Sequence, residues 1–441
     1  MGAATPTSFT ELGALPTQAH ALQDAVRFLR LPSTVRERCA AVADAVAAGR
    51  SSHLALDRSR LPELARRVAR LTRERYPGGE VPLHSCWRHF EAGGIDRRAV
   101  LDASLRGMEP AGAARARVDL AIVAVLLDGP SALHWQFREP GTGCQLGRAE
   151  GLGAAVFQAF MAGRFSSDPA DPLRVDADAL ARLNPGTIGE IFQARADNPL
   201  PGLDARLRLL QRLESVLRGR ADIFGQPGRP GRLLDLLGHV VVRGPDGREQ
   251  RLPVQRLRAP VMLRTLIKAF GAVWPGGAPL AGRVLGDVWS HPLAGGSGPG
   301  AGRVPLHTMA QWLALSLVEP LASGGIGIDQ LDELTGLAGM RHGGLFIDGG
   351  VIVPREPGFV RATHMVGDAA VVEWRALTVV LLDELARLVR AELGQPAMSL
   401  PAVLEGGVAA AGRELAVERR PGGPPPLTVS ASRMPKIHST L

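Results

Sequence analysis

The segment HSCWRHFEAGG at residues 84–94 gathers side chains that could bind a metal ion. His84, Cys86 and His89 carry ligand-type atoms, and His89 with Glu91 matches the H-x-E half of the zinc deaminase signature. The other half, P-C-x-x-C, is absent, and the remaining histidines form no second ligand pair at zinc spacing. We therefore predict no metal site; the alternative use of these side chains is hydrogen bonding within the loop.

Motifs for nucleophilic catalysis and phosphate binding are absent from the sequence. It contains no G-x-S-x-G, no S-x-x-K, no Walker A motif and no G-x-G-x-x-G between a strand and a helix. Charged side chains instead stand beside aromatic ones, which favours a pocket for a small polar ligand. Buried ion pairs that fix the register between domains are the alternative. These groups are Arg88 and Glu91 with Trp87 and Phe90; Asp128, Arg138 and Glu139 with Trp135; Asp332 with Arg341; and Glu373 and Arg375 with Trp374.

Arginine dominates the basic residues. Of 51 basic residues only Lys268 and Lys436 are lysines, and the formal net charge is +8. In residues 61–75 the apolar side chains repeat at helical spacing, and the arginines lie largely off that stripe, as on a solvated helix face. No zinc-finger or RNP pattern accompanies the charge, so we predict no nucleic-acid binding.

Cysteine use and hydropathy indicate a reduced setting away from membranes. Cys39, Cys86 and Cys144 are odd in number and show no C-x-x-C spacing, so we expect a cytoplasmic protein. The first residues lack the basic and apolar regions of a secretory leader. The longest apolar run, residues 120–127, is far shorter than the ~20 residues needed to span a bilayer, so we predict no membrane role.

Helices must position most of these side chains. Helical patterns cover residues 19–75, and they recur at 96–108, 111–127, 184–219, 307–321 and in EWRALTVVLLDELARLVRAEL. HVVVRGPDGREQRLPV and GGLFIDGGVIVP each predict a β-hairpin, while Gly and Pro crowd residues 274–302 into a loop region. The sequence therefore predicts a mainly α protein with one or two small β-hairpins.

The length of 441 residues and a hydrophobic content of 45% allow several domains. Breaks in the helical patterns suggest five parts. We predict an N-terminal helical segment (1–75), a helical domain that carries the HSCWRHFEAGG loop (76–225), a Gly- and Pro-rich connection with a hairpin (226–305), a C-terminal helical domain (306–420) and a tail (421–441).

Six segments resemble the signature segments of one family, an uncharacterised-domain family of the uracil catabolism (URC) pathway of fungi and bacteria. They are HSCWRHFEAGGIDR, RAEGLGAAVFQAFMAGRFSSDPADPLRVDA, GRVPLHTMAQWLALSLVEPL, LTGLAGMRHGGLFIDGGV, VVEWRALTVVLLDEL and PAVLEGG. The resemblance runs from about Val35 to about Val429. It implies a step in a route in which uracil becomes a ribonucleotide, a protein similar to GTP cyclohydrolase opens the ring, and a ribosylurea-type intermediate is split to release urea.

A weaker resemblance concerns the chemistry. QLDELTGLAGMRHGGLF and VVEWRALTV are similar to two segments of the queuosine salvage nucleosidases, which implies a helical fold like that of DNA glycosylases. Asp332, Arg341, Glu373 and Arg375 occupy the matching positions. The acidic residue that precedes the shared arginine in that family is absent here, where Met340 precedes Arg341.

This second resemblance implies hydrolysis of an N-glycosidic bond without a cofactor. An ionised carboxylate would stabilise an oxocarbenium-like state or orient water against it. We predict Asp332 as that carboxylate, with Glu373 sharing the role or holding the ribose hydroxyls; the alternative for Asp332 is a helix cap. The remaining substrate-binding candidates are Arg88, Arg138 and Arg375 for a phosphate or as supporting groups, Trp135 and Phe157 as walls, and Glu91 and Arg341.

Two rival functions remain open from the sequence. One is a non-catalytic scaffold or ligand-binding partner of the cyclohydrolase-like pathway enzyme. The other is an amidohydrolase acting on the ureido group, although a metal set of the usual ureidohydrolase kind is not found.

Overall fold

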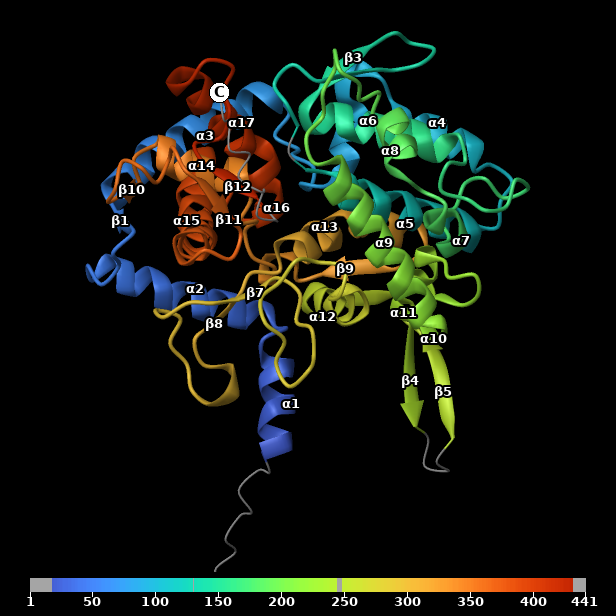
Figure 1. Ribbon diagram of the computed structural model, residues 1–441, viewed down its shortest axis with the longest axis horizontal. Coiled ribbons are helices and arrows are strands. Elements are labelled where there is room, and N and C mark those ends of the chain that lie inside the picture. The colour runs from blue at the N-terminus through green and yellow to red at the C-terminus, as the bar shows by residue number, and fades with distance from the viewer. Residues whose placement is uncertain (1–17, 130, 244–247, 431–441) are drawn as a thin grey trace, which may run out of the picture.

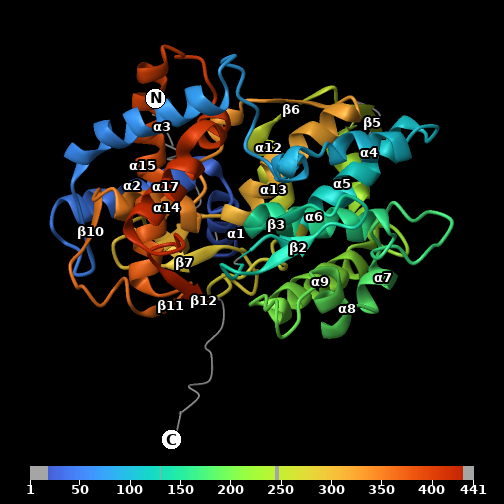
Figure 2. The same cartoon turned by 90° about the horizontal axis from the view of Figure 1, so that it is seen from above.

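A computed structural model describes residues 18–129, 131–243 and 248–430. Within them the chain forms two helical lobes, which lie side by side in Figures 1 and 2. One lobe combines segments from both ends of the described chain, and the other holds its middle. The prediction of a mainly α protein is confirmed, whereas the likeness to DNA glycosylases stays a prediction.

The first lobe is built around the long helix α15, on which α2 and α3 pack. All but a few residues in the first five turns of α15 are buried, so this helix is the centre of the lobe. The helices of this lobe are α2 (Pro32–Ala47), α3 (Leu61–Arg75), α14 (Met340–Asp348), α15 (Ala369–Leu393), α16 (Leu400–Val403) and α17 (Ala409–Arg419), with a π-helical turn, η6 (Leu404–Val408), between the last two.

Helix α3 shows how the arginine-rich helices are accommodated. Its apolar side chains face the core, while Arg67 and Arg70 pair with Glu414 of α17 at 2.9 and 2.8 Å. The arginines off the apolar stripe therefore lie on a solvated face, as the spacing predicts, and they join two helices far apart in sequence.

The second lobe surrounds α5, which is apolar around most of its circumference. Its residues 118–127 are all buried, and α13 packs along it. Together with α12, α13 lies between the lobes (Figure 2). The helices of the second lobe and of the region between the lobes are α4 (Arg97–Ser104), α5 (Pro110–Leu127), α6 (Arg148–Met161), α7 (Ala177–Ala181), α8 (Pro185–Ile191), α9 (Leu203–Gly219), α10 (Ala221–Phe224), α11 (Leu233–Leu237), α12 (Ala259–Phe270) and α13 (Thr308–Ser323). Helix α1 (Gln18–Phe28) projects from the underside in Figure 1. The segment η2 (Cys86–Gly94) is a kinked 3₁₀ helix.

Short strands pair two by two within the described ranges. The antiparallel pairs are β1 (Leu54–Leu56) with β10 (Ile352–Pro354), β2 (Gln136–Arg138) with β3 (Gln145–Gly147), β4 (His239–Arg243) with β5 (Glu249–Pro253), and β7 (Val288–Ser290) with β8 (Arg303–Pro305). The parallel pairs are β6 (Arg256–Arg258) with β9 (Gly327–Asp329), and β11 (Thr363–Met365) with β12 (Thr428–Ser430).

Of the two predicted hairpins, one is confirmed and one is wrong. HVVVRGPDGREQRLPV forms β4 and β5 around residues 244–247, which lie outside the described ranges. GGLFIDGGVIVP instead contributes to α14 and then to β10, whose partner is the distant strand β1. Gly343 serves close packing and not a turn, because a Cβ atom there would lie 2.4 Å from Cζ2 of Trp374.

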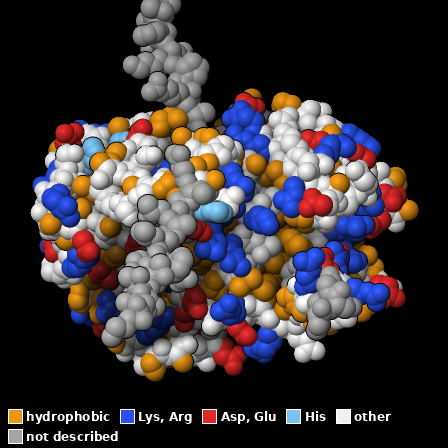
Figure 3. Space-filling view, turned by 90° about the horizontal axis from the view of Figure 1, so that it is seen from below, with side chains coloured by type: hydrophobic (Ala, Val, Ile, Leu, Met, Phe, Trp, Pro, Cys, Tyr) orange, Lys and Arg blue, Asp and Glu red, His pale blue; other side chains and the backbone are white. Residues whose placement is uncertain are grey.

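Basic, acidic and hydrophobic side chains are interspersed on the face seen from below in Figure 3. Among the described helices, none combines the length and apolar character that crossing a membrane requires. The five-part division of the chain stays a prediction.

Candidate active site at the lobe junction

The two carboxylates predicted to be catalytic lie near opposite ends of α15. Asp332 is 58% exposed, accepts a hydrogen bond from the backbone N–H of Leu400 at 2.5 Å and lies 3.5 Å from Arg390 in the last turn of α15. Glu373, in the second turn, is 1% exposed. Glu373 and Arg390 are roughly 25 Å apart along the helix axis. The structure therefore does not bring the two carboxylates into one site.

Glu373 is buried among polar groups. Its Oε1 accepts a 2.5 Å hydrogen bond from the hydroxyl of Ser51, and Nε2 of His291 lies 3.6 Å from Oε2. Burial raises the pKa of Glu373, and the Ser51 hydrogen bond opposes that rise. These contacts link the first lobe to the loop after β7.

Arg375, predicted to bind substrate, is paired within the protein. Its guanidinium makes two hydrogen bonds to Asp287, at 2.9 and 2.6 Å, and a third to the Thr308 hydroxyl. Burial would raise the pKa of Asp287, but the charge and hydrogen bonds of Arg375 hold it below its ordinary value. Such a bidentate buried pair fixes the start of α13 against α15.

Arg88 and Glu91 belong to a four-membered ionic network. Arg88 contacts Glu91 at 2.9 Å and Glu319 at 2.8 Å, and Arg98 contacts the same two carboxylates. This network ties η2 to α4 and α13, so Arg88 faces carboxylates of the protein itself.

Three further predicted residues lie in the second lobe. Trp135 is fully buried and donates from Nε1 to the carbonyl of Phe192 at 3.0 Å, and Phe157 is buried against Phe90. Arg138 is exposed on β2. Trp135 and Phe157 therefore pack in the core, and their role as ligand walls stays a prediction.

A different group of side chains converges where the lobes meet. We call it the histidine cluster; its members are His84, His89, Trp312, His342 and Glu405. Its centre is the contact between His84 Nδ1 and Glu405 Oε2, at 2.8 Å. The side chain of His84 retains 15% exposure and that of Glu405 only 8%, so the histidine is the more exposed member of the pair.

Backbone and tryptophan hydrogen bonds hold the His84 loop in place. The N–H of His84 donates to the carbonyl of Pro401 in α16 at 3.2 Å. Just beyond it, the N–H of Cys86 donates to the hydroxyl of Ser316, and Nε1 of Trp87 donates to the carbonyl of the same serine. The loop is therefore fixed to the first lobe at one end and to α13 at the other.

Glu405 is presented by the π-helical turn η6, an irregularity often found at functional sites. Its Oε1 accepts from Arg75 at 3.0 Å and from the Tyr76 hydroxyl at 3.1 Å. Burial would raise the pKa of Glu405, but His84 and Arg75 lower it to about 2, so the carboxylate is ionised at neutral pH. Gly407 lets the turn approach α3, because a Cβ atom there would meet the Val68 carbonyl at 2.3 Å.

Aromatic rings enclose His84. The centroid of Trp312 is 4.7 Å from that of His84 and 6.1 Å from that of His89, and His342 is 5.5 Å from His84. Burial lowers the pKa of His342 to about 3, so its ring is neutral. Nε1 of Trp312 is buried and has no hydrogen-bond partner among the described residues, which leaves a donor available to a ligand.

The arrangement of His84 and Glu405 is that of a base and its orienting carboxylate. When Nδ1–H of His84 donates to Glu405, Nε2 carries the lone pair that can accept a proton. Cys86 is unsuited to a similar role, since burial raises the pKa of its thiol to about 12. Over the ranges that the structure covers, no three His, Cys, Asp or Glu side chains are grouped so as to hold a metal ion.

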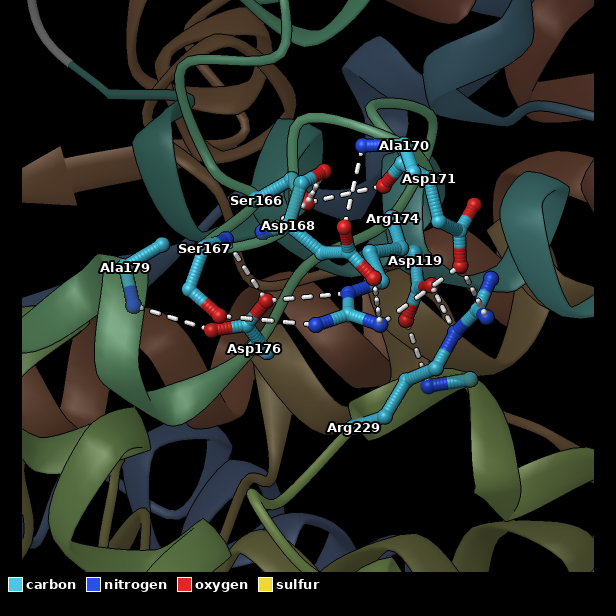
Figure 4. A network of polar contacts seen from close by, with 11 residues as sticks. Asp119, Ser166, Ser167, Asp168, Ala170, Asp171, Arg174, Asp176, Ala179 and Arg229 are labelled. Carbon is cyan, nitrogen blue, oxygen red and sulfur yellow. Dashed lines mark hydrogen bonds and ion pairs between the residues drawn. The ribbon is translucent and has the colours of Figure 1, made fainter.

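A second polar network, in the second lobe, is shown in Figure 4. Asp119 is fully buried and accepts from Arg229 at 2.7 Å, while Asp176 accepts from Arg174 at 3.0 Å. It borders a cavity of about 240 Å³. Because Asp171 also lies near both arginines, at 3.4 and 3.6 Å, carboxylates balance these cations and the network holds the SSDPADPLRVDA segment in place.

Sequence reasoning did not select Glu405, His342 or Trp312. All three lie in segments that carry the family resemblance, PAVLEGG, LTGLAGMRHGGLFIDGGV and GRVPLHTMAQWLALSLVEPL. A search of those segments for proton-transferring and aromatic side chains could have grouped them with His84. Local spacing could not, because His84 and Glu405 are 321 positions apart.

Comparisons with known proteins agree with the resemblance. A family model described as a protein of unknown function (DUF1688) matches residues 28–433. Uracil catabolism protein 4 of Lachancea kluyveri is 31% identical over 431 residues, which cover 91% of this chain and 96% of the relative. Protein urg3 of Schizosaccharomyces pombe is 33% identical over 375 residues, which cover 83% of this chain and 87% of the relative. The chain therefore belongs to the DUF1688 family, as its signature segments predict.

Proposed function

We propose that this protein acts in uracil catabolism by hydrolysing the N-glycosidic bond of a ribosylurea-type compound at the histidine cluster. The name of the relative from Lachancea kluyveri supports the pathway. The observation that carries the reaction is the 2.8 Å contact between His84 and the ionised, buried Glu405. It combines a proton acceptor with a fixed negative charge, which this kind of hydrolysis uses.

The proposed reaction adds water across the bond between the sugar carbon C1′ and the ureido nitrogen. That bond breaks with its electron pair on nitrogen, and the water oxygen bonds to C1′. One water proton passes to Nε2 of His84, and the imidazolium then delivers it to the leaving nitrogen, so the products are ribose, or its phosphate, and urea, and His84 is again neutral. The charge of Glu405 stabilises both the imidazolium and the positive sugar ring in the transition state.

Asp332 and Glu373 are the rival catalytic carboxylates, predicted from the resemblance to the nucleosidases. Each has a contact with a structural role: Asp332 accepts from the first turn of α16, and Glu373 accepts from Ser51. Glu405 has the additional property of touching a partly exposed histidine. The geometry therefore favours Glu405.

The test uses the purified full chain with N-ribosylurea and with its 5′-phosphate, and follows ribose, urea and ammonia by mass spectrometry. We expect a ribosyl product and intact urea. His84→Gln and Glu405→Gln should each lower kcat at least ~100-fold, the usual loss for a general base or its partner. His364→Gln is the matched control, because the ring of His364 bonds the backbone carbonyl of Phe359 and is not a member of the histidine cluster.

Each alternative has its own signature in this experiment. A loss of rate in Asp332→Asn or Glu373→Gln with full rate in Glu405→Gln would move the catalytic carboxylate to the corresponding sequence candidate. Ammonia in place of urea would identify an amidohydrolase. Absence of turnover, together with binding to the cyclohydrolase-like pathway protein, would identify a non-catalytic partner.

A further inference from the structure

Three arginines from three helices meet beside the histidine cluster. Nη1 of Arg341, in α14, donates to the carbonyl of Gly423 at 2.9 Å, and Nη2 of Arg148, in α6, lies 3.4 Å from the carbonyl of Gly422. Since these carbonyls belong to consecutive residues, the two guanidinium groups are held side by side. Arg413, in α17, is the third, and α17 packs against α14. We call Arg148, Arg341 and Arg413 the arginine trio.

The arginine trio has too few carboxylates to balance it. Glu150, in the first turn of α6, contacts Arg413 at 3.3 Å. Arg148 and Arg341 have no carboxylate within ion-pair distance among the described residues, and the carbonyls that they contact are neutral. The neighbouring Arg420 is itself paired with Asp348.

The contrast with the network in Figure 4 is direct. There, Arg174 and Arg229 each contact a buried aspartate, and further aspartates surround them. Arginines gathered without such partners repel one another, and burial with repulsion from Arg148 lowers the pKa of Arg341 to about 10. An anion between them would remove that repulsion.

Backbone geometry adds to the case. Arg148, the first residue of α6, has a φ of 56°, a left-handed conformation that is strained for a residue with a side chain. The residue before it, Gly147, has no side chain that could cap the helix. The first N–H groups of this 14-residue helix therefore do not donate to a capping side-chain oxygen. These donors stand at the same end of α6 as the arginine trio.

We infer that the arginine trio binds the phosphate monoester of the substrate, so that the ribosylurea-type compound is used as its 5′-phosphate. This inference rests on the proposed function for the identity of the sugar. Arg341 directly precedes His342 of the histidine cluster, and Arg413 lies two turns beyond Glu405. Phosphate at the arginine trio would therefore leave the sugar at the junction where His84 lies.

The test measures binding of ribose 5-phosphate and of ribose to the full chain by calorimetry, separately from turnover. We expect ribose 5-phosphate to bind at least roughly tenfold more tightly than ribose, and Arg341→Gln to abolish that difference. Arg148→Gln, on the other lobe, is the second variant and guards against a folding defect in the first. Arg164→Gln is the matched control, because this exposed arginine pairs with Glu190 at the surface.

Equal binding of the two sugars, or an equal loss in Arg164→Gln, would overturn the inference. Phosphate-dependent binding that Arg341→Gln and Arg148→Gln both abolish, with no hydrolysis of either ribosylurea, would support the subsite and refute the proposed function. Hydrolysis of both ribosylureas at one rate, without phosphate-dependent binding, would refute the subsite and support the proposed function.

Discussion

Replacing Glu405 with glutamine keeps the shape of the side chain and removes its charge. In the folded chain this carboxylate accepts hydrogen bonds from His84, Arg75 and Tyr76, which together favour the ionised form. Glu405→Gln would leave Arg75 without its anionic partner and His84 without its orienting carboxylate. We therefore expect a loss of folding stability as well as of activity.

The magnitude follows from the pKa. A value lowered from 4.5 to about 2 corresponds to about 3 kcal/mol of stability from ionisation of Glu405 at pH 7. Because the folded-state pKa is the lower one, the unfolded chain binds more protons below pH 4.5. The contribution is therefore complete above that pH and is lost as the pH falls towards 2, with about 1 kcal/mol left at pH 3.

Urea denaturation of the unmodified protein and of Glu405→Gln, at several pH values from 7 to 3, measures this contribution. The difference in unfolding free energy should be about 3 kcal/mol at pH 7 and should shrink by about 2 kcal/mol by pH 3. Glu414→Gln, which removes a partly exposed partner of Arg67 and Arg70, should cost no more than about 1 kcal/mol. A difference for Glu405→Gln that stays constant with pH would refute the reasoning.

Three further substitutions test the packing that supports the site. Arg97→Met leaves Glu139, which is 1% exposed, without its cation, and should lower the free energy of unfolding by about 3–5 kcal/mol in urea titrations. Gly153→Ala should lower the thermal midpoint and cost about 1–3 kcal/mol, because the new Cβ atom would lie 2.6 Å from Cβ of His89. Gly112→Ala, where the nearest atom is a flexible side-chain end at 3.7 Å, should instead stabilise α5 by up to about 1 kcal/mol; a loss of stability there would contradict the assigned packing.

The helices could be predicted because their patterns are local. The uninterrupted apolar run in α5 and the amphipathic repeat in α3 each identify a helix and its buried side from a few turns of sequence. The prediction of a hairpin in GGLFIDGGVIVP was wrong because the glycine in it has a role in tertiary packing that the local pattern does not show. Gly343 looks like a turn residue in sequence, but it is there because a tryptophan of another helix needs the space.

The candidate site could not be assembled from the sequence because its contacts are not local. Asp332 and Glu373 stood out through similarity to short motifs, although a helix separates them in space. His84 stood out through residue type, but its partner Glu405 lies near the other end of the chain. Which of several carboxylates contacts a given histidine depends on how the two lobes pack together. Spacing along the sequence does not determine that packing.

The contact between His84 and Glu405 also sets an order of events during synthesis. A nascent chain that has emerged as far as α13 already contains His84, Trp312 and the whole second lobe, yet it lacks α16, η6 and α17. His84 can therefore contact its carboxylate only after translation has reached Glu405, which is 321 positions after His84. Until then the surfaces of the second lobe that the C-terminal helices later cover are exposed on the nascent chain and can aggregate. Expression yield should therefore depend on how quickly the C-terminal helices dock.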